Sequence, residues 1–260
     1  MKKRHLIYVA CLLVAMGACS ATSKERAKIT PDAWGKYNVG TVLFEDKAPE
    51  TKGSDIYHRI IPDAESYIKA QAREVLATLY NSPEDSIPTV NKIHYTLEDI
   101  EGVSAKGGGN GDVTIFYSTR HIEKSFAAND TAKLFFETRG VLLHELTHAY
   151  QLEPQGVGSY GTNRVFWAFI EGMADAVRVV NGGFDGPNAR PKGGNYMDGY
   201  RTAGYFFVWL RDNKDPEFLR KFNRSTLEVI PWSFDGAIKH ILGNEYNIDE
   251  LWHEYQVAVG

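Results

Sequence analysis

Two acidic residues stand four positions apart in a segment whose other residues are almost all apolar. Glu171 and Asp175 lie in a stretch with helical periodicity that runs from about Val165 to Val180. Its large apolar residues are Phe166, Trp167, Phe169, Ile170, Val177 and Val179. Residues four apart share one face of a helix, so a fold that buries this helix buries both carboxylates. A buried carboxylate is costly unless it is paired or bound to a metal, and the fold must therefore supply positive charge.

Two sources of that charge are compatible with the sequence. Arg178, almost one turn beyond Asp175, can form a structural salt bridge with it, but this leaves Glu171 without a partner. A metal ion would instead make use of Glu171 as a ligand. The metal alternative requires further ligands from elsewhere in the chain.

Such ligands are present in the run His144-Glu145-Leu146-Thr147-His148. A helix is predicted from about Thr131 to Leu152, and in it His144 and His148 lie one turn apart on one face. Both imidazoles can then bind one ion, with Glu145 beside it. Zinc accepts neutral imidazole and keeps an open position for water when its site is catalytic.

The sequence thus predicts a site with distinct roles for its residues. Zinc is bound by His144, His148 and Glu171, and Glu145 acts as the general base. Asp175 is expected to accept the ring N–H of a ligating histidine, His144 being the favoured one. Tyr200 is the candidate donor to the developing oxyanion, because it follows a glycine-rich segment that could line a cleft. Two other tyrosines are its rivals, namely Tyr150 and Tyr160.

Strand patterns are found early in the chain and helical patterns late, which predicts an α+β domain with a small N-terminal mixed sheet and a mainly helical C-terminal part. Strands are expected at about 37–44, 92–97 and 112–118, and helices at about 62–80, 131–152, 165–180 and 199–212. The strand at 112–118 is expected either at the sheet edge, where an extended peptide can add by backbone hydrogen bonds, or inside the sheet.

The first residues resemble an export signal. Lys2, Lys3 and Arg4 precede an apolar run that is too short to span a bilayer. The run ends in Met-Gly-Ala-Cys, which resembles a bacterial lipobox and predicts a lipid anchor at Cys19; the alternative is ordinary cleavage and a soluble secreted protein. The expected organisation is a signal over residues 1–19, a tether and first strand over 20–53, and the main domain over 54–260.

The composition of the chain indicates which class of molecule the protein can bind. The chain is 43% hydrophobic and 24% charged, as expected for a globular domain. Its formal net charge is -4, and its lysines and arginines are spread along the sequence, so it has no basic surface typical of nucleic-acid binding. A protein or peptide is the expected partner, and the oligomeric state is not predicted.

Several segments together resemble the basic secretory protein family of plant and bacterial peptidases. They are Arg139–Gln151, Ile170–Asp175 and Gly199–Ala203, and the resemblance extends over roughly Asp55 to Tyr255. It implies a zincin-like fold and metallopeptidase activity, with Glu171 closing the zinc site as in gluzincins. The chain departs from the family's name, since its pI of about 6.1 is not basic.

Two classes of function follow. The first is a zinc-dependent peptidase, most simply an endopeptidase, that acts on extracellular or surface proteins. The second is a binding or adhesion lipoprotein on a zincin scaffold that cleaves nothing. An exopeptidase or a hydrolase specific for glycopeptides would share the zinc chemistry of the first class. Glu145 favours an enzyme, because a site that only binds zinc has no need of a general base.

Overall fold

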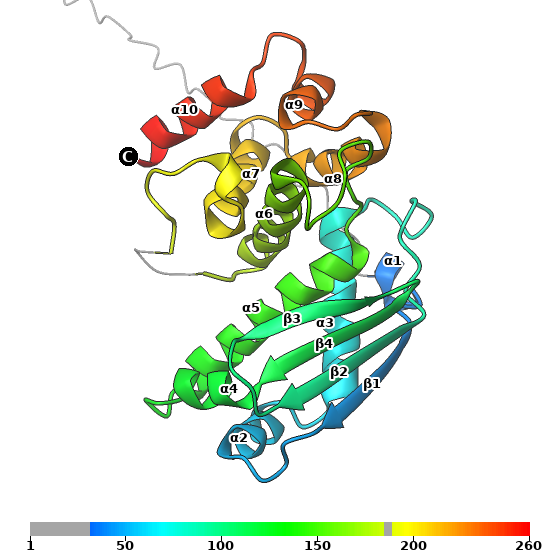
Figure 1. The fold of residues 1–260 in the computed structure, drawn as a ribbon, viewed down its shortest axis with the longest axis vertical. Helices are drawn as coiled ribbons and strands as arrows, with labels where there is room; N and C mark the ends of the chain where they lie inside the picture. Colours follow the sequence, from blue (N-terminus) through cyan, green and yellow to red (C-terminus); the bar gives the residue numbers. More distant parts are fainter. Residues whose placement is uncertain (1–31, 185–188) are drawn as a thin grey trace, which may run out of the picture.

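The computed structural model describes residues 32–184 and 189–260, in two parts that lie one above the other (Figure 1). One part is a four-stranded sheet with helices behind it, and the other is a group of helices from the second half of the chain. The predicted α+β class, with an N-terminal mixed sheet and a helical C-terminal part, is confirmed. The predicted signal and Cys19 lie outside the described residues. None of the helices described is long and apolar enough to span a membrane.

The sheet has the strand order β1-β2-β4-β3. Its strands are β1 (Thr41–Asp46), β2 (Lys92–Glu98), β3 (Ser104–Gly109) and β4 (Asp112–Ser118). Strands β1, β2 and β4 are parallel, and β3 pairs antiparallel with β4. The strand at 112–118 is therefore interior, and the edge on that side of the sheet belongs to β3.

No strand was expected at β3, because its sequence is rich in glycine, which disfavours strands. The strand forms because a tight hairpin folds it back on β4. Asn110 and Gly111 make up the two-residue loop, with φ of 53° and 83°. This Asn-Gly pair is the preferred sequence for a type I′ hairpin turn and is the local signal for β3.

Two long helices, α3 (Ala64–Leu79) and α5 (Thr131–Tyr150), lie behind the sheet (Figure 1). Both begin at an aspartate whose side chain accepts a backbone N–H of the first turn, Asp63 in α3 and Asp130 in α5. At the end of α5, the Tyr150 hydroxyl donates to the carbonyl of Val39 at 2.7 Å, and the Tyr150 carbonyl accepts from the Tyr80 hydroxyl at 2.6 Å. These buried bonds fix the end of α5 to the rest of the sheet layer.

Three short helices complete this part of the molecule and were not predicted: α1 (Asp32–Gly35), α2 (Lys52–Ile60) and α4 (Thr119–Ser125). Helices α2 and α4 pack side by side at the end of the sheet. The close contact occurs at Gly53, where a Cβ would overlap the carbonyl of Thr119.

The helical part begins with α6 (Arg164–Val180), which packs on both α5 and α7 (Tyr200–Asn213). It continues through α8 (Phe218–Glu228), α9 (Phe234–Leu242) and α10 (Ile248–Val259), and a short 3₁₀ helix, η1 (Tyr196–Asp198), precedes α7. Helices α6 and α7 approach closely because glycines face the contact. A Cβ on Gly172 would lie 2.6 Å from Phe207 and 2.7 Å from Ala203.

We expect Gly172→Ala to destabilise the protein, because the added methyl group would separate α6 from α7. Overpacking of this kind costs about 1–3 kcal/mol, which outweighs the roughly 1 kcal/mol that alanine gains over glycine inside a helix. Chemical unfolding measures the difference. The matched control is Gly35→Ala, since nothing lies within 4 Å of a Cβ there. A Gly172→Ala protein as stable as the control would show that the contact tolerates a side chain.

Candidate active site

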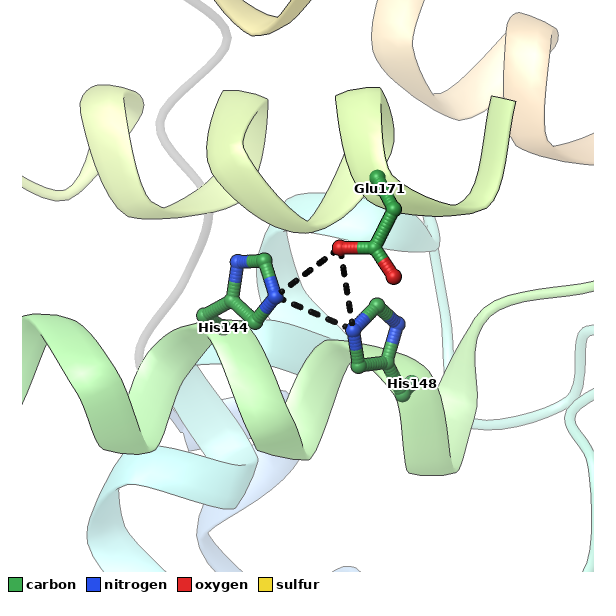
Figure 2. Close-up of side chains that lie close together, drawn as sticks. All are labelled: His144, His148 and Glu171. Atoms are coloured by element: carbon green, nitrogen blue, oxygen red, sulfur yellow. Dashed lines mark hydrogen bonds and ion pairs between the residues drawn. The ribbon is translucent and has the colours of Figure 1, made fainter. Parts of the chain in front are cut away.

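The side chains of α5 and α6 meet in the gap between the two helices (Figure 2). His144 and His148 point up from α5, and Glu171 points down from α6. One ligand atom from each of the three residues lies within 4.8 Å of the other two. The Nε2 atoms of His144 and His148 are 3.0 Å apart, and Glu171 Oε2 lies 3.3 Å from the first and 3.8 Å from the second.

The surroundings of the Glu171 carboxylate indicate what this cluster can bind. Its side chain is buried, and Oε1 accepts a hydrogen bond of 2.6 Å from the Tyr160 hydroxyl. Oε2 is buried too, and it has no hydrogen-bond partner among the described residues. A buried carboxylate oxygen without a hydrogen-bond partner, together with the two imidazole nitrogens that it faces, forms a donor set of the kind that zinc binds. The residues therefore fit a divalent metal ion.

Asp175 lies on the far side of His144 from this cluster. Its Oδ1 is 2.7 Å from His144 Nδ1, so the carboxylate accepts the ring N–H and leaves Nε2 free to bind an ion. Arg178, which the sequence offered as an alternative partner for Asp175, pairs with another residue. Its Nη2 lies 2.7 Å from Glu137 Oε2 on α5. Arg178 crosses α5 at Gly140, where a Cβ would overlap its guanidinium group. The structure thus pairs Asp175 with a histidine.

Gln151 takes a similar position at the second histidine, a role that the sequence analysis did not anticipate. Its amide nitrogen, Nε2, lies 2.9 Å from His148 Nδ1, while Gln151 Oε1 is buried and has no hydrogen-bond partner among the described residues. If the amide group is turned over, Oε1 faces the ring instead, accepts Nδ1–H and leaves His148 Nε2 free to bind an ion. The local signal is the spacing, because Gln151 follows His148 by about one helical turn.

The charges of the buried carboxylates beside the two histidines also favour a bound cation. Burial alone would lower the pKa of His144, but the carboxylates of Asp175 and Glu171 outweigh it and raise that pKa to about 10. Burial and the neighbouring positive His144 lower the pKa of His148 to about 3. Without a metal, the acidic residues thus hold a proton on one ring of the pair. A metal ion would take the place of that proton.

Glu145 lines the same cleft and is 6% exposed. Burial raises the pKa of its carboxyl group, and the positive charge of His144 and a hydrogen bond from Ser104 of β3 oppose that rise. A carboxylate whose pKa is raised from its ordinary value is a better proton acceptor near neutral pH.

The three candidate tyrosines occupy different places. Tyr200 begins α7, and its ring stacks on that of His144 with centroids 6.0 Å apart. Tyr160 lies in the loop before α6 and bonds to Glu171. Both line the cleft. Tyr150 points to Val39 instead, behind the sheet, and its hydroxyl is not among the groups that line the cleft.

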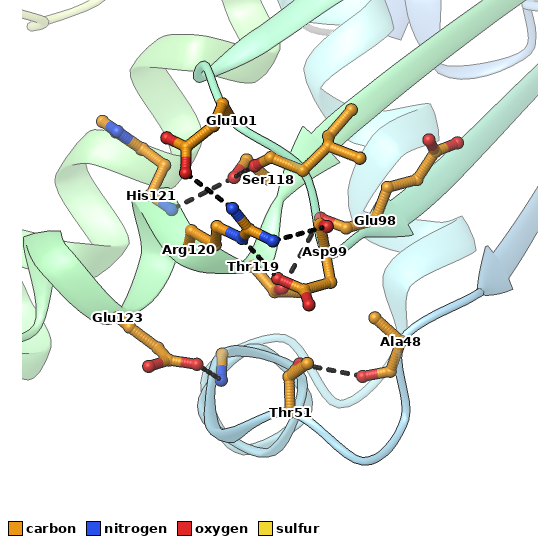
Figure 3. Close-up of polar contacts among 12 residues, drawn as sticks. Ala48, Thr51, Glu98, Asp99, Glu101, Ser118, Thr119, Arg120, His121 and Glu123 are labelled. Carbon is orange, nitrogen blue, oxygen red and sulfur yellow. Dashed lines mark hydrogen bonds and ion pairs between the residues drawn. The ribbon is translucent and has the colours of Figure 1, made fainter.

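The cleft has a volume of about 890 Å³, and Val103 and the first three residues of β3 form one wall of it. The turn that leads into β3 is held by Arg120 at the start of α4 (Figure 3). Its guanidinium group lies 2.6 Å from Asp99 Oδ1 and 2.6 Å from Glu101 Oε1. The Ser118 hydroxyl donates to the carbonyl of Ile100 at 2.6 Å. These contacts tie the edge strand to the interior of the sheet at the point where it enters the cleft.

One of three comparisons with known proteins gave a match. A family model described as a peptidase of plants and bacteria, and abbreviated BSP, matches residues 39–255. Comparison with curated proteins and with solved structures gave no significant match. The matched residues include the whole cleft and all of its candidate side chains. The resemblance that the sequence motifs indicated is therefore confirmed, and the chain belongs to this peptidase family of plants and bacteria.

Proposed function

We propose that this protein is a zinc-dependent peptidase with a zincin-like fold. One observation carries the proposal: the buried Oε2 of Glu171, which has no hydrogen-bond partner among the described residues, faces the Nε2 atoms of His144 and His148 next to a cleft-lining Glu145. An antiparallel edge strand beside the helix that holds both histidines, with a third ligand from the next helix, supports the zincin-like assignment.

The ligand set decides what the metal can do. A zinc ion bound by two imidazoles and one carboxylate keeps an open position, lowers the pKa of water there to about 7 and polarises a carbonyl oxygen. Asp175 contacts Nδ1 of His144 and Gln151 contacts Nδ1 of His148, so the Nε2 atoms of both rings would be the ones to bind the ion. Tyr160 holds the carboxylate of Glu171 by Oε1, so that Oε2 faces the same point.

Glu145 acts on protons in this proposal. It takes a proton from the attacking water and passes it to the leaving amine, as a carboxylate with a raised pKa can do near neutral pH. Tyr200 donates to the oxyanion that develops on the substrate carbonyl, since its ring lies against His144 and its side chain is 47% exposed in the cleft. Tyr160 is its rival, although its hydroxyl is held by Glu171.

A protein or peptide is the substrate that the cleft favours. The edge strand β3 lines it, and an extended peptide can pair with the free edge of β3 by backbone hydrogen bonds. The lining continues on both sides of the histidines, to Val141 at one end and Phe166 at the other. Room on both sides of the metal group supports an endopeptidase over an exopeptidase. A non-catalytic adhesion protein on the same scaffold remains the second candidate, and turnover decides between them.

The first prediction separates the two acidic residues of α6. Glu171→Ala removes a ligand and should weaken zinc binding severely, by more than the effect at Asp175. Asp175→Ala removes only the acceptor of a ring N–H, which should weaken binding by about 10- to 100-fold. Competition with a chelator of known affinity measures both, with Glu153→Ala in the same cleft as the control. The reverse order of effects would exchange the two roles.

The second prediction concerns turnover. Glu145→Gln should keep zinc and lose most activity on any peptide that the parent protein cleaves, because the general-base contribution is worth roughly 10²- to 10⁴-fold. Glu84→Gln makes the same change of charge on an exposed turn and should leave activity as it is. Metal analysis of both proteins shows whether zinc is retained. Undiminished turnover in Glu145→Gln would assign the base elsewhere.

We also propose that the protein is exported and held at the bacterial cell envelope by a lipid on Cys19, with secretion as a soluble protein as the alternative. The positive residues and apolar run before Cys19 support this. Cys19→Ala should then release the protein from the membrane fraction or block its processing. Cys11→Ala, inside the apolar run, is the matched control. Unchanged fractionation and unchanged mature mass in Cys19→Ala would exclude the anchor.

A further inference from the structure

The two ends of the cleft differ in charge. Around the histidines the lining is acidic, and one end is completed by Glu153 and Phe166. The opposite end, toward the start of α5, is lined by Val141, Arg178, Phe184 and Arg201. Two arginines therefore lie at one end of a cleft that we propose binds peptides. We name the set Val141, Arg178, Phe184 and Arg201 the arginine end.

Arg178 is the fixed member of this set. Its side chain is 8% exposed and lies against Glu137, but Glu137 also faces a second basic group, since its Oε1 is 3.2 Å from His121 Nε2. Arg178 Nε is buried and has no hydrogen-bond partner among the described residues. Within the described part of the chain, the one carboxylate paired with Arg178 is thus shared, and the five-donor guanidinium group of Arg178 is incompletely satisfied.

Phe184 joins the two arginines. The guanidinium carbon of Arg178 lies 3.8 Å from the centre of its ring, and that of Arg201 lies 5.4 Å from the same centre. The backbone of Phe184 has φ of 55°, which is unusual for a bulky residue, and its carbonyl accepts a 2.5 Å hydrogen bond from the Tyr205 hydroxyl. A strained backbone conformation persists where the surrounding structure enforces it. At Phe184 this conformation holds the aromatic ring against the guanidinium groups of Arg178 and Arg201.

Arg201 is the exposed member. It forms no ion pair with any acidic residue in the described part of the chain, and its one hydrogen bond is a long one of 3.4 Å to the carbonyl of Ala189. A second positive charge close to Arg178 is unfavourable unless an anion lies between or beside them. Among the residues that the structure describes, none supplies such an anion for Arg201, whereas a ligand in the cleft can.

We propose that the arginine end binds a carboxylate of the peptide substrate and so selects for acidic substrates. This inference rests on the proposed peptidase function. Guanidinium groups bind carboxylates through charge-assisted, often bidentate hydrogen bonds, which fits a planar acid group next to Phe184. The carboxylate can come from an aspartate or glutamate side chain or from the C-terminus of the peptide.

The experiment uses matched peptides. A peptide library read by mass spectrometry first gives a bond that the zinc-loaded parent protein cleaves. Peptides around that bond then differ only by Asp against Asn at each flanking position, or by a free C-terminal acid against an amide. The parent should prefer one acidic form by roughly tenfold or more in kcat/KM, the magnitude expected for a hydrogen bond to a charged group. The position of the preferred acid tells a side-chain carboxylate from a terminal one.

Variants then test whether the arginine end is responsible. Arg201→Gln should lower the acid-to-amide ratio toward one. A second variant, Glu137→Gln with Arg178→Gln, removes Arg178 together with the carboxylate that it pairs with and should do the same. Arg224→Gln, which removes an exposed arginine on α8, is the control and should keep the parental ratio.

Binding separates this inference from the proposed function. Calorimetry with the same peptides and the Glu145→Gln protein should show the same acid preference, and its loss when Arg201→Gln is added. If the parent cleaves no peptide, the peptidase proposal fails, and calorimetry with peptides from the same library in matched acid and amide forms decides the carboxylate site. An acid preference that is absent, or that both arginine variants leave unchanged, would overturn the inference.

Discussion

The burial of two carboxylates on α6 against two imidazoles on α5 is the interaction on which the rest of this structure depends. Glu171 and Asp175 are each 3% exposed, and removing the positive partner of a buried charge pair typically costs about 3–5 kcal/mol. His144 lies between both acids, so its charge state decides whether the cluster is balanced. A divalent ion would satisfy the acids and leave both rings neutral, which would link the stability of this helix pair to the proposed chemistry.

The elements around the helix pair place it in a cleft. Gly172 lets α7 pack closely on α6, which brings Tyr200 against His144. The hairpin at Asn110 folds β3 back along the sheet, so that the cleft has a strand edge as one wall. One site thus brings together a helix pair with buried charges, an edge strand and a tyrosine. These elements come from distant parts of the sequence.

The sequence was most informative where the signal was local. Glu171 and Asp175 share a helical face, as do His144 and His148, and the helix period alone predicts which side chains point together. The sequence could not show that Arg178 pairs with Glu137, or that Tyr160 reaches Glu171. Those contacts depend on how α5, α6 and a loop are placed. Strand β3 was missed because glycine propensity argues against strands and only the turn after it favours one.

X-ray diffraction at the zinc absorption edge tests the central claim most directly, with crystals grown from protein purified without chelator. The predicted result is one anomalous peak between α5 and α6, about 2.0–2.2 Å from the Nε2 atoms of His144 and His148 and from a carboxylate oxygen of Glu171. Crystals grown with added zinc that show no peak between these side chains, or a peak bound by other residues, would contradict it.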